Sequence, residues 1–195
     1  MRRCGQRLPA GAAIRPAAPA DARGIARVHV ETWRSAYPGI LPDKVMVGLT
    51  VDQKASDWRR RLEAPREQEG VLVAAIDGEV VGFTGFGRVT GSLAAGEVFT
   101  LYVLSDWQDQ GLGRALLAGA FEHLAQAGAP SALIWVLAEN PARFFYEAMG
   151  GTRAGARDEQ AWGARLHEYA YLWPDLAGWT ADQGGGACGG AKKPE

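Results

Sequence analysis

The sequence predicts a single α/β domain with a mixed sheet, of the α+β kind. Three observations predict it: apolar runs of strand length alternate with amphipathic helical segments, an Asp77-Gly78 pair joins two runs as a hairpin, and one run leads through a glycine-rich turn into a helix. Hairpins pair strands antiparallel and strand–helix–strand crossovers pair them parallel, so one sheet should contain both. At 195 residues and 47% hydrophobic content, the chain suits one domain with a full core.

The first part of the chain is mostly helical after a short strand at 13–15. A helix opens at Pro19 and must end before Pro38, because the residue that precedes a proline avoids the helical conformation. Two more helices are expected at 42–49 and 51–63.

The pattern then changes to strands. Apolar runs predict strands at 71–76, 79–88 and 97–104, and Asp77-Gly78 supplies the tight turn between the first two. These three strands should lie together in the sheet.

The remaining elements alternate helix and strand before a closing strand pair. A helix is expected at 111–127, a strand at 132–137 and a second helix that opens at Pro141. Residues 152–157 and 166–173 are expected to form the closing pair.

The chain is expected to have loose ends on either side of the domain. Residues 1–11 are interpreted as a flexible lead, 12–176 as the domain, and the glycine-rich 177–195 as a flexible tail. Cys4 and Cys188 lie in these opposite ends and form no disulfide framework, which fits a reducing cytoplasm.

Composition argues against several classes of partner. A net charge of −1 gives no general attraction to nucleic acid or to an anionic membrane. No apolar run approaches the ~20 residues of a membrane span, and the basic start lacks the apolar segment of a secretory signal. No cluster of cysteine and histidine indicates a metal.

The most informative motif runs from Trp107 to Leu117 and has the form Q-x-x-G-x-G, through Gln108, Gly111 and Gly113. It joins a strand to the start of a helix, where converging backbone N–H groups and the helix dipole favour an anion. A pyrophosphate is the expected ligand. An ordinary strand-to-helix turn remains the alternative, because the motif is neither a Walker loop nor a dinucleotide fingerprint.

A second block, from Asn140 to Gly150, begins just after a strand and contains Phe145-Tyr146. With the first motif it resembles the GCN5-related N-acetyltransferases (GNAT), which use acetyl-CoA. The resemblance covers roughly 14–173, and the stretches 31–42 (ETWRSAYPGILP) and 169–174 are similar to one branch of the family. Gly151 departs from the aromatic residue often found there, which removes a packing group without threatening the chemistry.

The resemblance implies the GNAT fold, a central, mostly antiparallel sheet flanked by helices, with acetyl-CoA as co-substrate. It implies that a strand pairs its backbone with the pantetheine arm and that loop N–H groups hold the pyrophosphate. For Gln108 the alternative is an ordinary loop hydrogen bond, for Arg114 a solvated side chain, and for Asn140 a helix cap alone. The implied coenzyme-binding residues are Leu101, Tyr102, Val103, Gln108, Asp109, Gln110, Gly111, Leu112, Gly113, Arg114, Asn140 and Arg143.

The resemblance also implies catalytic roles. Tyr146 is expected to act as the general acid that protonates the leaving thiolate, and the alternative is a core tyrosine. An ammonium must lose a proton before it can attack, and Glu97 is the expected base, directly or through water; the alternative is a strand-end surface residue. Trp33 and Tyr37 are expected in the acceptor pocket, with core packing as their alternative.

The expected activity is direct transfer of an acetyl group to a primary amine of a small molecule or peptide. No cysteine lies near the motifs to carry the acetyl group. A non-catalytic acyl-CoA-binding sensor is the alternative from another class, and an acyl group other than acetyl stays open. Dimerisation is common in this fold, and the closing strands are the candidate interface of a homodimer.

Overall fold

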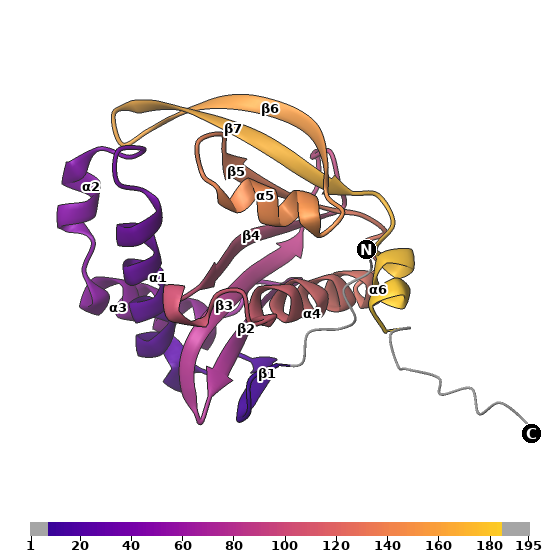
Figure 1. The fold of residues 1–195 in the computed structure, drawn as a ribbon, viewed down its shortest axis with the longest axis horizontal. Helices are drawn as coiled ribbons and strands as arrows, with labels where there is room; N and C mark the ends of the chain where they lie inside the picture. Colours follow the sequence, from indigo (N-terminus) through magenta and orange to yellow (C-terminus); the bar gives the residue numbers. More distant parts are fainter. Residues whose placement is uncertain (1–7, 185–195) are drawn as a thin grey trace, which may run out of the picture.

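The computed structural model of the protein describes residues 8–184. In this part the chain forms a seven-stranded sheet with helices on both faces (Figure 1), which confirms the predicted mixed α/β architecture. The strands are β1 (Ala12–Pro16), β2 (Glu69–Ile76), β3 (Glu79–Arg88), β4 (Gly96–Val103), β5 (Ala132–Leu137), β6 (Thr152–Ala161) and β7 (Ala164–Trp173). The helices are η1 (Pro19–Asp21), α1 (Ala22–Ala36), α2 (Asp43–Gly48), α3 (Val51–Glu63), η2 (Ser105–Trp107), α4 (Leu112–Gln126), α5 (Ala142–Ala148) and α6 (Leu176–Gly184).

The sheet order is β1-β2-β3-β4-β5-β7-β6, and its two halves meet at β4 and β5. Strands β1 to β4 pair antiparallel, and so do β5, β7 and β6. Strands β4 and β5 run parallel and pair only at Gly96–Ala132 and Glu97–Leu133. Past that point, in the described part of the chain, β4 pairs only with β3 and its other edge has no strand partner. The sheet is therefore split between its halves.

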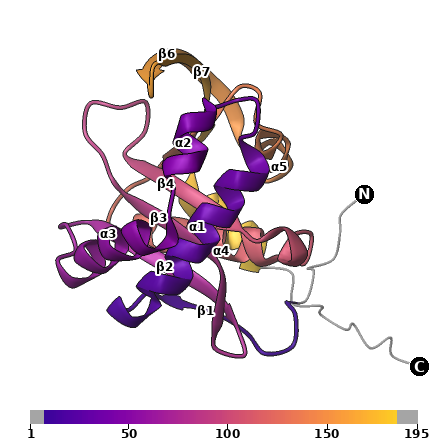
Figure 2. The same ribbon diagram turned by 90° about the vertical axis from the view of Figure 1, so that its left-hand side faces the viewer.

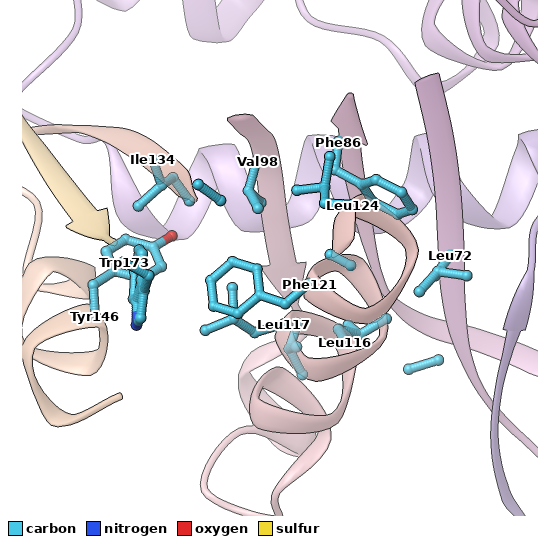
Figure 3. Packing of buried hydrophobic residues seen from close by; sticks show 14 of the residues in the cluster. Leu72, Phe86, Val98, Leu116, Leu117, Phe121, Leu124, Ile134, Tyr146 and Trp173 are labelled. Atoms are coloured by element: carbon cyan, nitrogen blue, oxygen red, sulfur yellow. The ribbon is translucent and has the colours of Figure 1, made fainter. Parts of the chain in front are cut away.

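Two apolar clusters hold the helices on opposite faces of the sheet. Helices α1 and α3 cover one face (Figure 2), where Ile25 and Trp58 pack on Phe83 of β3. Helix α4 covers the other face, and Leu116 and Phe121 lie in the cluster of buried residues shown in Figure 3. Of the helices described, none combines the length and the apolar character needed to cross a membrane.

The closing strands are longer than the sequence indicated. They were expected at 152–157 and 166–173, but β6 and β7 continue to a two-residue turn at Trp162-Gly163, where φ is 54° and 80°. Most of β6 is exposed, so it lacks the alternation of apolar and polar residues that marks a half-buried strand. The hairpin arches over the molecule toward α2 (Figure 1).

The folded part extends beyond residue 176, so the expected start of the tail at 177 is too early. Leu176 is fully buried, and the indole nitrogen of Trp179 donates to the Met149 carbonyl at 2.7 Å. These contacts hold α6 against the core, and Thr180 and Gly184 fall within its bounds. At the other end Leu8 packs against the core. Residues 1–7 and 185–195 of the expected lead and tail, with both cysteines, lie outside the described residues.

Trp173 explains the glycine at position 151. Its indole is 1% exposed, and a Cβ built on Gly151 would lie 2.6 Å from that ring and 3.0 Å from the Tyr146 carbonyl oxygen. The space that an aromatic residue would need at this position is already filled from β7.

Candidate active site

The split between β4 and β5 is a cavity of about 580 Å³, a volume typical of small-molecule sites. One wall is the edge of β4 from Phe99 to Val103, and the facing wall is β5 from Ile134 to Leu137. The end of α1, the start of α5 and the β6–β7 hairpin complete the lining. Because β4 lacks a strand partner on this side in the described chain, its backbone groups are available to a bound molecule.

The loop before α4 has the backbone geometry of an anion site. Gly111 is the N-cap residue of the helix, with φ 83° and ψ −6°, and its cap makes no side-chain hydrogen bond. The preceding Asp109 also has a positive φ, 57°. This left-handed geometry lets the first N–H groups of α4, from Leu112 and Gly113 on, face an anion at the positive end of the helix dipole.

The glutamine side chains of this loop stabilise it internally. Gln108 lines the cavity, and its side-chain nitrogen donates to the carbonyl of Val103 at 3.0 Å. Gln110 donates to the Asp106 carbonyl at 2.9 Å. The loop hydrogen bond that the sequence offered as the alternative role of Gln108 is therefore present.

Asn140 and Arg143 are placed differently with respect to the cavity. Asn140 lines it and is 7% exposed, and its side-chain oxygen accepts the N–H of Ala142 at 2.9 Å, which caps the start of α5. Arg143 is not among the lining residues; its guanidinium lies 4.0 Å from the ring centre of Phe144.

Tyr146 lies on α5 and lines the same cavity. It is 5% exposed, and its ring packs against Phe145 and Trp173. Burial, followed by the neighbouring Tyr37, raises the pKa of the Tyr146 hydroxyl. The hydroxyl is therefore fully protonated at neutral pH, as a proton donor must be.

Trp33 and Tyr37 also line the cavity and belong to a bonded aromatic group. The indole nitrogen of Trp33 donates to the hydroxyl of Tyr102 at 3.1 Å. Burial raises the pKa of the Tyr37 hydroxyl, and the neighbouring side chains of Tyr102 and Asn140 lower it. The hydroxyl groups of Tyr37 and Tyr146 are therefore close enough for Tyr37 to influence the pKa of Tyr146.

Glu97 lies where β4 and β5 still pair, and it is not among the residues that line the cavity. It is half-buried. Burial raises the pKa of its carboxyl group, Arg157 lowers it and Glu168 raises it again. Glu97 therefore lies outside the cavity lining, and the charges of Arg157 and Glu168 influence the pKa of its carboxyl group.

The lining also contains residues that the sequence analysis did not identify. Trp162 lies at the turn of the hairpin, and its ring centre is 5.7 Å from that of Trp33. Glu159 and Glu168 are the only charged side chains among the lining residues that the structure describes. Gly163 was the one local signal of a turn at this place, but residues 152–161 show no strand pattern, and nothing in the sequence indicated which face of the hairpin meets the cavity.

Comparisons with known proteins agree with this architecture. The model of the Acetyltransferase (GNAT) family matches residues 30–151. An uncharacterised N-acetyltransferase, YuaI, of Bacillus subtilis (strain 168) is 36% identical over 167 residues, which is 84% of this chain and 94% of that protein.

Two solved structures share the fold. The PaiA N-acetyltransferase of Thermoplasma acidophilum, in complex with coenzyme A, is similar with a TM-score of 0.60 at 18% identity, over 81% of this chain and 97% of that one. A GNAT-family acetyltransferase of Streptococcus pneumoniae has a TM-score of 0.61 at 19% identity, over 83% of this chain and 98% of that one. The chain therefore belongs to the acetyltransferase (GNAT) family.

Proposed function

We propose that the protein transfers the acetyl group of acetyl-CoA directly to a primary amine of a small molecule or peptide. The observation that carries this proposal is the cavity between β4 and β5, which brings together the edge of β4 that has no strand partner in the described chain, Tyr146, Trp33 of α1 and Tyr37 just after it. No cysteine lines the cavity in the described part of the chain, which supports transfer without a covalent acetyl-enzyme.

In this proposal the loop before α4 holds the pyrophosphate of the coenzyme. The N–H groups from Gln110 to Arg114 face the phosphates, and Asn140 and Arg143 lie beside the coenzyme. The left-handed Gly111 and the absence of a side-chain cap at the start of α4 support this role, because both leave the backbone donors accessible.

A substitution at Gly111 tests the anion site. We expect Gly111→Ala to weaken acetyl-CoA binding about tenfold, the value of one hydrogen bond to a charged group. The control is Gly128→Ala at the other end of α4, because Gly128 has a similar φ, 82° against 83°. In both variants the free energy of unfolding should be lower by about 1 kcal/mol. Calorimetric titration measures the affinity of each variant for acetyl-CoA. If the two variants bind acetyl-CoA with equal affinity, the loop before α4 is not the phosphate site.

The pantetheine arm is proposed to lie along Leu101, Tyr102 and Val103, where one N–H group polarises the thioester carbonyl. Glu97 is proposed as the base, acting through water because it lies behind the lining. Its raised pKa, which burial causes, makes it a stronger proton acceptor than an exposed carboxylate.

The experiment that tests the proposal measures thiol release from acetyl-CoA with pooled amines and peptides. We expect release that requires an amine, and mass spectrometry of the product should show one added acetyl group on nitrogen. A protein that binds acetyl-CoA but releases no thiol with any pool would favour a non-catalytic acyl-CoA-binding module. Matched assays with longer acyl-CoA thioesters would show whether acetyl is the preferred group.

A further inference from the structure

The charged and aromatic residues that line the cavity under the β6–β7 hairpin indicate which class of amine the site accepts. We propose that the acceptor is a diamine: one primary amine is acetylated, while the second amine stays protonated during the reaction and is held as an ammonium group by the carboxylates and aromatic rings under the β6–β7 hairpin. This inference rests on the proposed acetyltransferase function.

The charge of the lining is the first argument. Glu159 and Glu168 are its only charged side chains in the described part of the chain. Arg157 is the cation that pairs with them, at 3.5 Å from Glu159 and 2.7 Å from Glu168. One cation against two carboxylates leaves an excess negative charge, and Glu97 beside them adds another. The site therefore attracts a cation and repels an acceptor that bears a carboxylate.

The aromatic side chains are the second argument. Trp33 packs edge-to-face against Tyr37, with ring centres 5.2 Å apart, and against Trp162. Trp162 is 47% exposed although it is a large apolar residue, and it occupies a turn position with a positive φ that a tryptophan rarely adopts. Indole and phenol rings beside carboxylates bind ammonium groups through cation–π attraction.

An unpartnered buried group is the third argument. Thr32 lines the cavity from α1, is 9% exposed, and its hydroxyl oxygen has no hydrogen-bond partner within the described structure. A buried hydroxyl without a partner is unfavourable, and rotation of the Thr32 side chain toward the cavity that it lines would let this oxygen accept a hydrogen bond from a ligand. Lys44 is not among the residues that line the cavity; it lines a neighbouring hollow that shares Trp33 and Trp162 with the cavity, and its Nζ would lie 3.3 Å from a Cβ built on Gly163.

The charge state of the attacking nitrogen favours an acceptor with a second cationic group. The nitrogen that attacks the thioester must first lose its proton, so it is neutral when the new N–C bond forms and the C–S bond breaks. That proton leaves to the base, and the thiolate takes a proton from the acid. The carboxylate Glu168 is held by Arg157, and Glu159 lies on the hairpin three residues before Trp162. The negative charge that Arg157 leaves unbalanced is matched throughout the reaction by a group that stays protonated, which the attacking nitrogen is not.

Rates with amines of equal length test the inference. We expect kcat/KM for 1,4-diaminobutane to exceed those for n-butylamine and 4-aminobutanol about tenfold or more, with 4-aminobutyrate the poorest acceptor. Glu159→Gln and Glu168→Gln should reduce the diamine-to-monoamine ratio several-fold, and the ratio cancels general losses of activity. Asp158→Asn is the control, because Asp158 neighbours Glu159 but bonds Arg165 and His167 instead of lining the cavity.

A measurement of diamine binding tests the site even if the protein shows no turnover. Diamines of three to six carbons should change the tryptophan fluorescence of the enzyme loaded with coenzyme A, and n-butylamine at equal concentration should not. Amine-dependent thiol release with no preference for any diamine would overturn this inference and leave the acetyltransferase function standing. Diamine binding without thiol release would support the site and count against the function. If neither diamine binding nor thiol release is observed, both the diamine site and the acetyltransferase function are rejected.

Discussion

Tyr146→Phe should lower kcat for acetyl transfer by about 10²-fold or more while KM for acetyl-CoA changes little. The substitution removes only the hydroxyl group, and the phenyl ring keeps its contacts with Phe145 and Trp173. Burial raises the pKa of this hydroxyl, which makes it a weaker acid in the free protein. A thiolate released into the same cavity is also poorly solvated and therefore more basic, so the two shifts compensate.

The matched control is Tyr171→Phe. Tyr171 neighbours Tyr146, with ring centres 6.2 Å apart, but its hydroxyl donates to Glu147 and it does not line the cavity. Its loss should leave kcat near the wild-type value. Steady-state thiol release at saturating amine measures both variants. If Tyr146→Phe keeps more than a third of the wild-type kcat, another group or water protonates the thiolate.

The second large effect concerns stability in acid and depends on His29. Its side chain is 8% exposed, and the indole nitrogen of Trp58 donates to its Nδ1 at 3.4 Å. Its Nε2 has no partner within the described structure. Burial, with a smaller contribution from Lys54, lowers the pKa of His29 from 6.5 to about 4. The unfolded chain therefore binds an extra proton between these two pH values.

The free energy of unfolding should fall as the pH drops below about 6.5 and stop falling, on this account, below about 4. The shift in pKa corresponds to a total loss of about 3 kcal/mol, of which about 2 kcal/mol is lost by pH 5. Urea unfolding at a series of pH values measures this loss. His29→Asn keeps an acceptor for the Trp58 indole and cannot be protonated, so its stability should depend less on pH in this window.

The same substitution at His123, which is exposed on α4, controls for replacing any histidine by asparagine. Other groups titrate in both the wild type and the variant, so the difference between their curves isolates the contribution of His29. An unchanged slope in His29→Asn between pH 6.5 and 4 would assign the acid sensitivity to other residues.

Much of the fold was predictable because local signals were strong. The helix at Val51–Glu63 and the strands at Glu79–Arg88 and Ala132–Leu137 have the bounds that the sequence predicted. Prolines and the Asp77-Gly78 turn fixed the ends of neighbouring elements. The exposed hairpin was underestimated, because a strand with solvent on most of its length shows no apolar alternation.

The sequence by itself determined the elements that depend on near neighbours: the glycine turn before α4, the cap that Asn140 gives α5, and the alternation that forms the core strands. These follow from backbone conformation and periodicity, which act over a few residues. Only the tertiary structure decided that β4 and β5 separate after two residue pairs, and that Thr32, Glu159 and Trp162 face one cavity with Tyr146. The β4–β5 pairs join residues 36 positions apart, and Thr32 lies more than a hundred positions before the other three residues, so the geometry depends on how whole layers pack.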